Sequence, residues 1–282
     1  MSDENNPFPG ENNTGHVWDD SLRELLNEPP TWWRIGFHAS WIFVVIYCIL
    51  YPAWPLLTTA TKGVLGWTSL QEYREDLKAI EEVRAPFENK LKDMSAAAIL
   101  SDEEMSNYVV RSAKVLFGDN CSACHGAGGQ GNVGYPVLAD DDWLYGGAIE
   151  NIVESITIGR QAMMPAQAAM VSSAEADQLA EAILAGNVAS NPLYLEKGCA
   201  GCHGIDARGM TIMGSVNLTD SIYRFVAKDQ LYSVKHTIMH GVNDPVDAKT
   251  RNAVMPAFGG TKLSDTDIKK LAVYVHKLGG GQ

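Results

Sequence analysis

The sequence predicts an all-α protein in which one N-terminal membrane-spanning helix is followed by a helical stalk and two copies of a small helical domain. Three observations carry this prediction. Residues 35–57 form an apolar run without Asp, Glu, Lys or Arg. A Cys-x-x-Cys-His motif occurs twice, starting at Cys121 and at Cys199, 78 residues apart. Helix-capping patterns recur at matching positions around the two motifs.

The composition allows about two globular domains and argues against a nucleic-acid partner. Of the 282 residues, 46% are apolar and 20% are charged, which is ordinary for globular protein. The formal net charge is -12 and no basic cluster is present, so we expect no nucleic acid to bind.

Residues 1–34 form a polar N-terminal segment rich in Asn, Glu and Pro. It lacks a basic region followed by a cleavage site, so it is not a signal peptide. We expect one short amphipathic helix from Trp18 to Leu26, with Asp19 and Asp20 capping its start.

Residues 35–57 are predicted to be the transmembrane helix. Trp33 and Trp54 are 21 residues apart, and a helix of that length covers roughly 30 Å, the thickness of the hydrocarbon layer. Tryptophans favour the two membrane interfaces, so a buried core helix is the weaker alternative. Cys48 in this run is interpreted as a small hydrophobe. His38, about one turn inside the span, is either functional or neutral at the headgroup level.

Residues 58–100 are predicted to be a helical stalk or linker. The pattern from Thr68 to Asp93 is helical and strongly charged, and Pro86 should end or kink the helix. The stalk would hold the following domains away from the membrane. Its charged face is either a docking surface or simply solvated.

The Cys-x-x-Cys-His motifs predict covalent attachment of two haem c groups. In such a motif two thiols on a helical turn bond to the haem vinyl groups, and the adjacent imidazole binds the iron. A dithiol redox pair, a zinc site or short-loop disulfides would leave both histidines unexplained. The predicted attachment residues are Cys121, Cys124, His125, Cys199, Cys202 and His203.

The chain after the stalk is an internal repeat of one domain, predicted to span residues 101–187 and 188–282. Each unit runs from the haem motif to a Met-Pro-Ala sequence, which starts at Met164 in the first unit and at Met255 in the second. The separation of haem histidine and methionine is 39 residues in unit one and 52 in unit two. Most of the difference lies between Gly241 and Met255.

Three capped helices are expected in this repeat. Ser101 with Glu104 should open a helix that runs to Phe117. The other two capping pairs follow the Met-Pro-Ala sequences and are Ser172 with Glu175 and Ser264 with Asp267.

Met164 and Met255 are the candidate second axial ligands of the two irons. A thioether paired with His raises the reduction potential relative to two imidazoles, and the following Pro would fix the backbone of the loop. Met163 is the alternative in unit one. Met210, Met213 and Met239 are interpreted as core filler. His236 and His240, spaced i and i+4, suggest a metal site or a bis-histidine haem, but ordinary helix positions explain them better.

Four more residues are candidates for contacts with haem or with its histidine ligands. Pro136 lies where similar cytochrome c domains use a proline carbonyl to accept a hydrogen bond from the ligating imidazole and orient the ring, and this resemblance implies the same contact here, with Val216 at the matching position of unit two. Trp143, its counterpart Tyr223 and the adjacent Arg224 are candidate donors to the haem propionates.

The whole chain resembles the dihaem cytochrome c subunit, or subunit III, of cbb3-type cytochrome c oxidases. The resemblance covers the N-terminal TGHVWDDSLRELLNEPPTWWRI, the span ending in YPAWP, the stalk beginning at Trp67 and both haem units. It implies two class I-like cytochrome c domains that take electrons from a donor cytochrome c or a cytochrome bc complex. It further implies transfer to a monohaem cytochrome subunit and then to the catalytic haem-copper subunit, which reduces oxygen and pumps protons. The chain would not be an enzyme on its own.

The motifs leave open which methionine serves which haem. Pairing within each unit is the default expectation. Exchange of the two methionines between closely packed units would satisfy the same four axial residues.

Orientation in a bacterial inner membrane is inferred from the haem chemistry. The basic residues flanking the span are balanced. Haem attachment takes place outside the inner membrane, so we expect a cytoplasmic N-terminus and periplasmic haem domains. An acidic surface would suit a basic electron donor, although solubility explains it equally well.

Alternative functions are a tethered dihaem carrier for another reductase or dehydrogenase, a dihaem peroxidase, and a sensor or structural subunit. A peroxidase needs an open or displaceable iron site, whereas both units here supply a Met-Pro loop. Oxygen reduction by this chain alone is excluded, because one span cannot house a haem-copper site.

Overall fold

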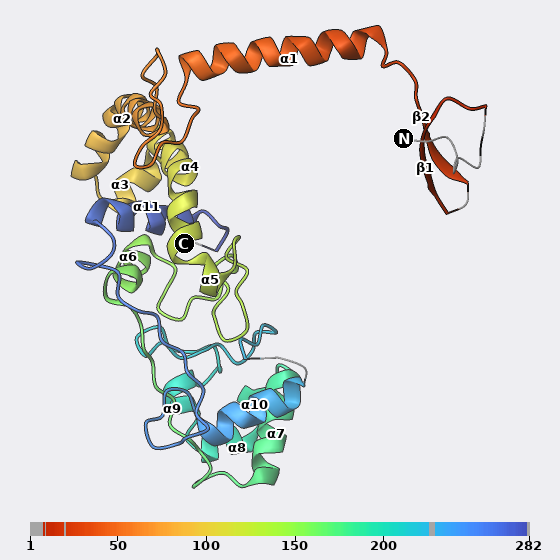
Figure 1. Ribbon diagram of the computed structural model, residues 1–282. Coiled ribbons are helices and arrows are strands. Elements are labelled where there is room, and N and C mark those ends of the chain that lie inside the picture. Colours follow the sequence, from red (N-terminus) through yellow and green to blue (C-terminus); the bar gives the residue numbers. More distant parts are fainter. Residues whose placement is uncertain (1–7, 9, 20, 226–228, 281–282) are drawn as a thin grey trace. The chain divides into compact units, whose positions relative to one another are not determined.

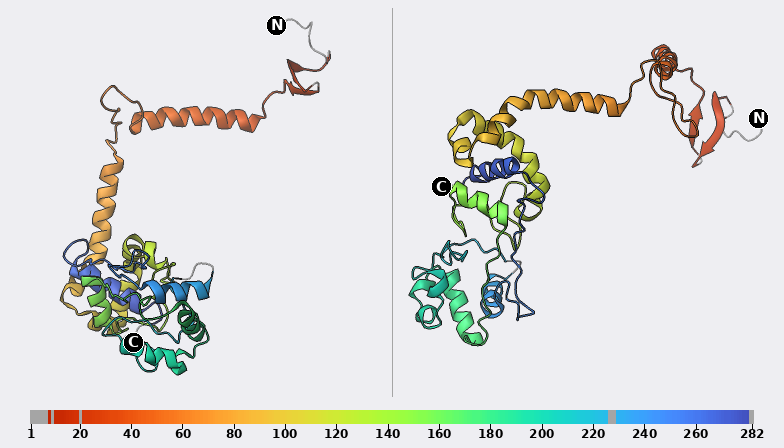
Figure 2. Two further views of the ribbon diagram at one scale, coloured as in Figure 1. Left: turned by 90° about the horizontal axis from the view of Figure 1, so that it is seen from below. Right: turned by 90° about the vertical axis from the view of Figure 1, so that its left-hand side faces the viewer.

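The computed structural model describes residue 8 and residues 10–19, 21–225 and 229–280. The chain divides into two compact units, Met1–Val83 and Arg84–Gln282. Its elements are mostly helical (Figures 1 and 2), which confirms the predicted fold class.

The N-terminal segment contains a β-hairpin in place of the expected helix. β1 (Asn13–Trp18) pairs antiparallel with β2 (Leu22–Leu25), with Trp18 opposite Leu22. Asp19 has a φ of 47°, a left-handed conformation that Asp tolerates in turns and that a helix interior excludes. The prediction of a helix over Trp18–Leu26 was therefore wrong, because Asp19, interpreted as a cap, lies where the chain reverses between the two strands. The other predicted cap, Asp20, lies outside the described residues.

α1 (Thr31–Leu50) is long and apolar enough to cross a membrane. Its 20 residues correspond to about 30 Å of helix. It ends before the predicted Leu57, because Pro52 favours an extended backbone at the residue before it, and Tyr51 has a ψ of 162°.

The chain after α1 folds back onto the end of the helix. The N–H of Val64 donates to Ile49 O at 2.9 Å, and the N–H of Leu65 donates to Leu50 O at 3.1 Å. A Cβ on Gly63 would lie 2.3 Å from Leu50 O, and the φ of this glycine is +64°. These bonds satisfy carbonyls that a helix C-terminus otherwise leaves unpaired.

α2 (Ser69–Asp93) is the predicted charged helix. Pro86 lies inside it and does not end it. The proline lacks an N–H, so the intrahelical bond to the carbonyl of Glu82 is missing at this point.

The compact unit Arg84–Gln282, which carries both haem motifs, contains two lobes, each with its own buried core. The first lobe is built on α3 (Ala96–Ser101), α4 (Glu103–Asn120), α6 (Ile149–Ile158) and α11 (Asp265–His276). The second lobe is built on α7 (Ser173–Leu184), the short 3-10 turn Val188–Ser190, α8 (Pro192–Glu196) and α10 (Gln230–His240). The most completely buried large side chains of the first lobe are Leu91, Ile99, Met105, Val109, Phe117, Leu271 and Val273.

The two repeats exchange their C-terminal helices. α11 follows the Met-Pro-Ala sequence of the second repeat, yet it packs on α4 and α6 of the first (Figure 1). α7 follows the Met-Pro-Ala sequence of the first repeat and packs on α10 of the second. Figure 2 shows the same grouping from two further sides.

Two of the three predicted helix caps are confirmed. Ser172 with Glu175 and Ser264 with Asp267 form complete capping boxes at α7 and α11. The third prediction was wrong, because Ser101 ends α3 and the N-cap of α4 is Asp102, whose carboxylate accepts from Met105 N at 3.1 Å. An ionised Asp next to the helix start serves the same purpose as the expected serine.

Candidate functional site

The first Cys-x-x-Cys-His motif lies directly after α4. Cys121 caps that helix, donating its N–H to Phe117 O at 2.8 Å. α5 (Ser122–His125) is a single turn that ends at Gly126, where φ is 77°. This turn places both cysteines and His125 on one compact segment, with the His125 side chain buried.

The second motif repeats this geometry in the second lobe. α9 (Ala200–His203) follows Cys199 and ends at Gly204, where φ is 80°. The N–H of His203 donates to Cys199 O at 3.0 Å, and the matching bond from His125 to Cys121 O is 2.9 Å. His203 is buried to the same extent as His125.

Both imidazoles are oriented by a backbone carbonyl. The Nδ1 of His125 lies 3.0 Å from Pro136 O, and the Nδ1 of His203 lies 3.0 Å from Val216 O. A carbonyl only accepts, so each Nδ1 carries the proton and donates it. Burial lowers the pKa of both histidines. The rings are therefore neutral, with Nε2 available as a metal ligand.

Each Met-Pro-Ala loop is hydrogen-bonded to the opposite repeat. The N–H of Met164 donates to Val242 O and the N–H of Val242 donates to Met164 O, both at 2.9 Å. In the same way the N–H of Arg160 donates to Met255 O at 3.0 Å, and the N–H of Met255 donates to Arg160 O at 2.9 Å. Arg160 directly follows the glycine that ends α6, and Val242 directly follows the glycine that ends α10. The two pairs of bonds therefore occupy equivalent positions in the two repeats.

Each candidate methionine packs beside the lobe that holds the haem motif of the other repeat. Met255 is partly buried against the first core, in the group that also contains Cys121. Met164 is half-buried beside the end of α10 in the second lobe, whereas the neighbouring Met163 is 61% exposed. The backbone contacts bring each methionine loop to the other repeat.

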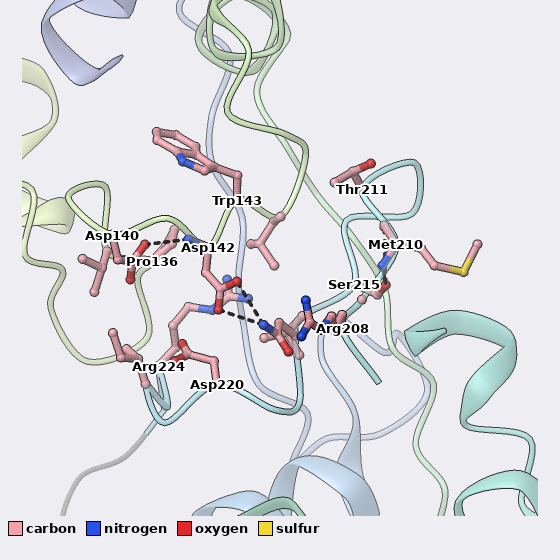
Figure 3. Close-up of a pocket in the computed structure, with 16 residues that line it drawn as sticks. Pro136, Asp140, Asp142, Trp143, Arg208, Met210, Thr211, Ser215, Asp220 and Arg224 are labelled. Atoms are coloured by element: carbon pink, nitrogen blue, oxygen red, sulfur yellow. Dashed lines mark hydrogen bonds between the residues drawn. The ribbon is translucent and has the colours of Figure 1, made fainter. Parts of the chain in front are cut away.

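A cleft between the loops that contain Pro136 and Val216 is lined by residues of both repeats (Figure 3). Pro136, Asp142 and Trp143 line it from the first repeat, and Asp220 and Arg224 line it from the second. The side chains also meet directly, since the Nδ2 of Asn217 donates to Asp142 Oδ1 at 3.1 Å. Burial, followed by the proximity of Asp142, raises the pKa of Asp220.

Arg224 is suited to an anionic group that would enter this cleft. Burial lowers the pKa of its guanidinium, and within the described part of the chain Arg224 forms no ion pair. A desolvated cation without an anionic partner is costly. Haem propionates are anions of the right kind, so the residues present fit the cofactor that the motifs predict.

Trp143 and Tyr223 donate to backbone carbonyls in this structure. The Nε1 of Trp143 donates to Gly280 O at 2.5 Å, and the Tyr223 hydroxyl donates to Ile183 O at 3.3 Å. Their contacts with propionates remain predictions.

His236 and His240 point to the loop that lengthens the second repeat. His236 Nε2 lies 2.9 Å from Lys249 O, and His240 Nδ1 lies 2.9 Å from Asp247 Oδ2. Within the residues that the structure describes, no three His, Cys, Asp or Glu side chains converge to hold a metal ion.

Two polar residues of this loop were missed by the sequence reasoning. Asn243 bonds to the backbone of both methionine loops, and the buried carboxylate of Asp244 accepts from Ala166 N at 2.7 Å. The only signal for them was the extra length between Gly241 and Met255. Loop length alone does not reveal which backbone a side chain reaches.

Three family models match successive parts of the chain. They are described as the N-terminal domain of cytochrome oxidase-cbb3, FixP (residues 10–58), cytochrome C oxidase, cbb3-type, subunit III (residues 108–181) and cytochrome c (residues 189–279).

Curated relatives match over almost the full length. The cbb3-type cytochrome c oxidase subunit FixP of Azorhizobium caulinodans is 38% identical, over 97% of this chain and 94% of its own length. The cbb3-type cytochrome c oxidase subunit CcoP of Cereibacter sphaeroides is 35% identical, over 97% of both chains. The corresponding FixP of Sinorhizobium medicae is 36% identical, over 97% of this chain and 96% of its own length.

Proposed function

Because this chain belongs to the FixP and CcoP family of cbb3-type cytochrome c oxidase subunits and has an electron-transfer role in the oxidase, we propose that it carries electrons through two haem c groups. Its cytochrome c domains imply haem c as the cofactor. When bound, haem c supplies an iron that alternates between ferrous and ferric states. The protein residues would hold that iron, supply its ligands and limit its exposure to water.

The two motifs are the proposed attachment sites. Cys121 and Cys124 would bond covalently to one haem, and Cys199 and Cys202 to the other. His125 and His203 would each present Nε2 to the iron, because Nδ1 is already engaged by a carbonyl at 3.0 Å. Fixing the ring in this way prevents the ligand from rotating between oxidation states.

The methionines are proposed to be exchanged between the repeats. Met255 would complete the site of His125, and Met164 would complete the site of His203. The observation that carries this pairing is the reciprocal backbone bonding of Met255 with Arg160 and of Met164 with Val242. Each bond pair brings the methionine to the end of a helix that belongs to the other repeat.

The proposed electron path begins at a donor cytochrome c or a cytochrome bc complex. Electrons would pass through the two haems to the monohaem cytochrome subunit and then to the catalytic haem-copper subunit. The path requires the haem domains to be periplasmic and the segment before α1 to be cytoplasmic, in a bacterial inner membrane. α1 would serve as the single membrane anchor, since its length and composition suit a span.

The experiment that tests the ligand assignment uses chains with a single haem. In the full-length C121S/C124S variant only the second haem remains. Adding M164A should make that haem five-coordinate and high-spin, whereas adding M255A should leave it low-spin. The opposite result would establish pairing within each repeat.

The reciprocal variant provides the control for misfolding. In C199S/C202S the remaining haem should respond to M255A and not to M164A. Mass measurement of the unmodified chain should show two bonded haems. A mass with fewer would contradict the dihaem proposal irrespective of the methionine results.

A further inference from the structure

Asn243 lies in the segment by which the second repeat exceeds the first. It follows Gly241 and Val242 at the end of α10 and has a φ of 52°. Asn adopts this left-handed conformation more readily than most residues. Its backbone N–H donates to Arg251 O at 2.7 Å, which closes the base of the loop.

The Asn243 side chain reaches the two methionine loops at equivalent points. Its Nδ2 donates to Ala162 O at 2.7 Å, two residues before Met164. The same Nδ2 donates to Ala253 O at 2.9 Å, two residues before Met255. Its Oδ1 accepts from Ala253 N at 2.9 Å. Both amide hydrogens and the carbonyl oxygen are therefore used, and the two acceptors belong to different repeats.

We propose that Asn243 is a positioning residue that holds both axial methionine loops with one amide group and thereby couples methionine ligation at the two haems. This inference rests on the proposed function, in which Met164 and Met255 are the ligands. Displacement of the Met164 loop breaks one bond of the shared amide, and displacement of the Met255 loop breaks two. The amide then loses part of the geometry that holds the other loop.

Comparison with the neighbouring Asp244 shows that contact with both methionine loops is specific to the Asn243 amide and is not shared by the other polar side chains of this loop that the structure describes. Asp244 binds the first methionine loop alone, through Ala166 N at 2.7 Å, and its other carboxylate oxygen accepts from Val246 N at 2.9 Å. Asp247 binds His240 and Lys249 N within the loop region. Within the described residues, neither carboxylate bonds to the Met255 loop.

Two substitutions distinguish the effect of the Asn243 side-chain bonds from the effect of its left-handed backbone conformation. N243G keeps access to the left-handed conformation and removes the side-chain bonds. N243D keeps the size of the side chain but places a carboxylate oxygen against two carbonyl oxygens. D247N is the matched control, because it alters the same loop without touching either methionine loop.

The readout is ¹³C-methyl NMR of methionine in the ferrous full-length protein, together with carbon monoxide binding. An iron-bound methionine has a methyl signal strongly shifted by the porphyrin ring current, and carbon monoxide binds only where the methionine leaves the iron. N243G should move both shifted signals. It should increase the carbon monoxide-accessible fraction about fivefold at the haem of Met164, as expected for one lost hydrogen bond, and by more at the haem of Met255, whose loop loses two. N243D should have a larger effect, and D247N should match the unmodified protein.

Several results would overturn the coupling. They are a change at one haem only in N243G, no change in either signal, or an equal change in D247N. Failure of the proposed function has a different signature, since the unmodified protein would then lack two ring-current-shifted methionine methyls.

Discussion

A Cβ placed on Gly159 would lie 2.4 Å from the carbonyl oxygen of Met255. The equivalent contact in the other direction joins Gly241 and Met164, where the distance to the carbonyl oxygen would be 2.2 Å. Both glycines have a positive φ, +72° and +68°. Only glycine allows the chain to leave each helix in this direction while the methionine loop of the other repeat approaches so closely.

G159A and G241A should therefore each disturb one haem, and it should be the haem of the repeat that carries the glycine. We expect each substitution to destabilise its lobe by about 1–3 kcal/mol, through the disfavoured backbone and the steric contact. G159A should displace Met255 and weaken ligation at the first motif, and G241A should do so at the second. Resonance Raman spectra of single-haem variants would detect the change in coordination.

G118A is the control for these glycine variants. Gly118 lies in α4, is exposed, and a Cβ there would meet nothing within 4 Å. Alanine should be neutral or slightly stabilising at this helix position. An effect of G159A confined to the second haem would contradict the assignment.

The exchanged helices predict which lobe responds to a core substitution. Leu271 of α11 is 0% exposed and Leu179 of α7 is 2% exposed. Replacing either with Ala should cost about 2–5 kcal/mol. In hydrogen-exchange mass spectrometry, L271A should loosen α4 of the first repeat, and L179A should loosen α10 of the second. Loosening within the same repeat only would show that the helices are not exchanged in solution.

Arg224 should raise the potential of the haem that it approaches. A nearby positive charge favours the ferrous state, so R224L should lower at least one haem potential. Spectroelectrochemical titration of the full chain would measure both potentials. R111L removes an exposed charge from α4 and should leave them unchanged. Equal potentials in R224L and the unmodified protein would exclude a propionate contact.

The capping box of α7 should stabilise the fold in a way that is lost in acid, because it depends on the ionised carboxylate of Glu175. Its hydrogen bond with Lys197, followed by those with Ser172, lowers its pKa from 4.5 to about 2. Because the folded value lies below the unfolded one, the stabilisation is fully present above pH 4.5. It is lost as the pH falls toward 2.

The measurement compares the unfolding free energy of E175Q with that of the unmodified chain across this range. The difference should be constant above pH 4.5 and shrink below it. A difference that does not change with pH would show that the ionised carboxylate is not the stabilising form.

The local features of the fold were predictable where a short pattern determines them. Ser172 and Ser264 cap their helices because the interaction involves residues three apart. The bonds of His125 and His203 to Pro136 O and Val216 O were expected from the resemblance to cytochrome c domains and not from spacing, since the two separations differ by two residues. The hairpin at Trp18 was missed, because Asp19 is compatible with a helix cap and with a turn.

The sequence by itself determined the repeated haem motifs, the apolar span of α1 and the methionine candidates, since each is a property of contiguous residues. Only the tertiary structure decided that α7 and α11 pack on the opposite repeats and that Asn243 touches both methionine loops. The physical reason is the similarity of the two repeats. Both helices begin with the same type of capping box, so local sequence does not distinguish the core on which each packs, and contacts between residues far apart in the chain decide it.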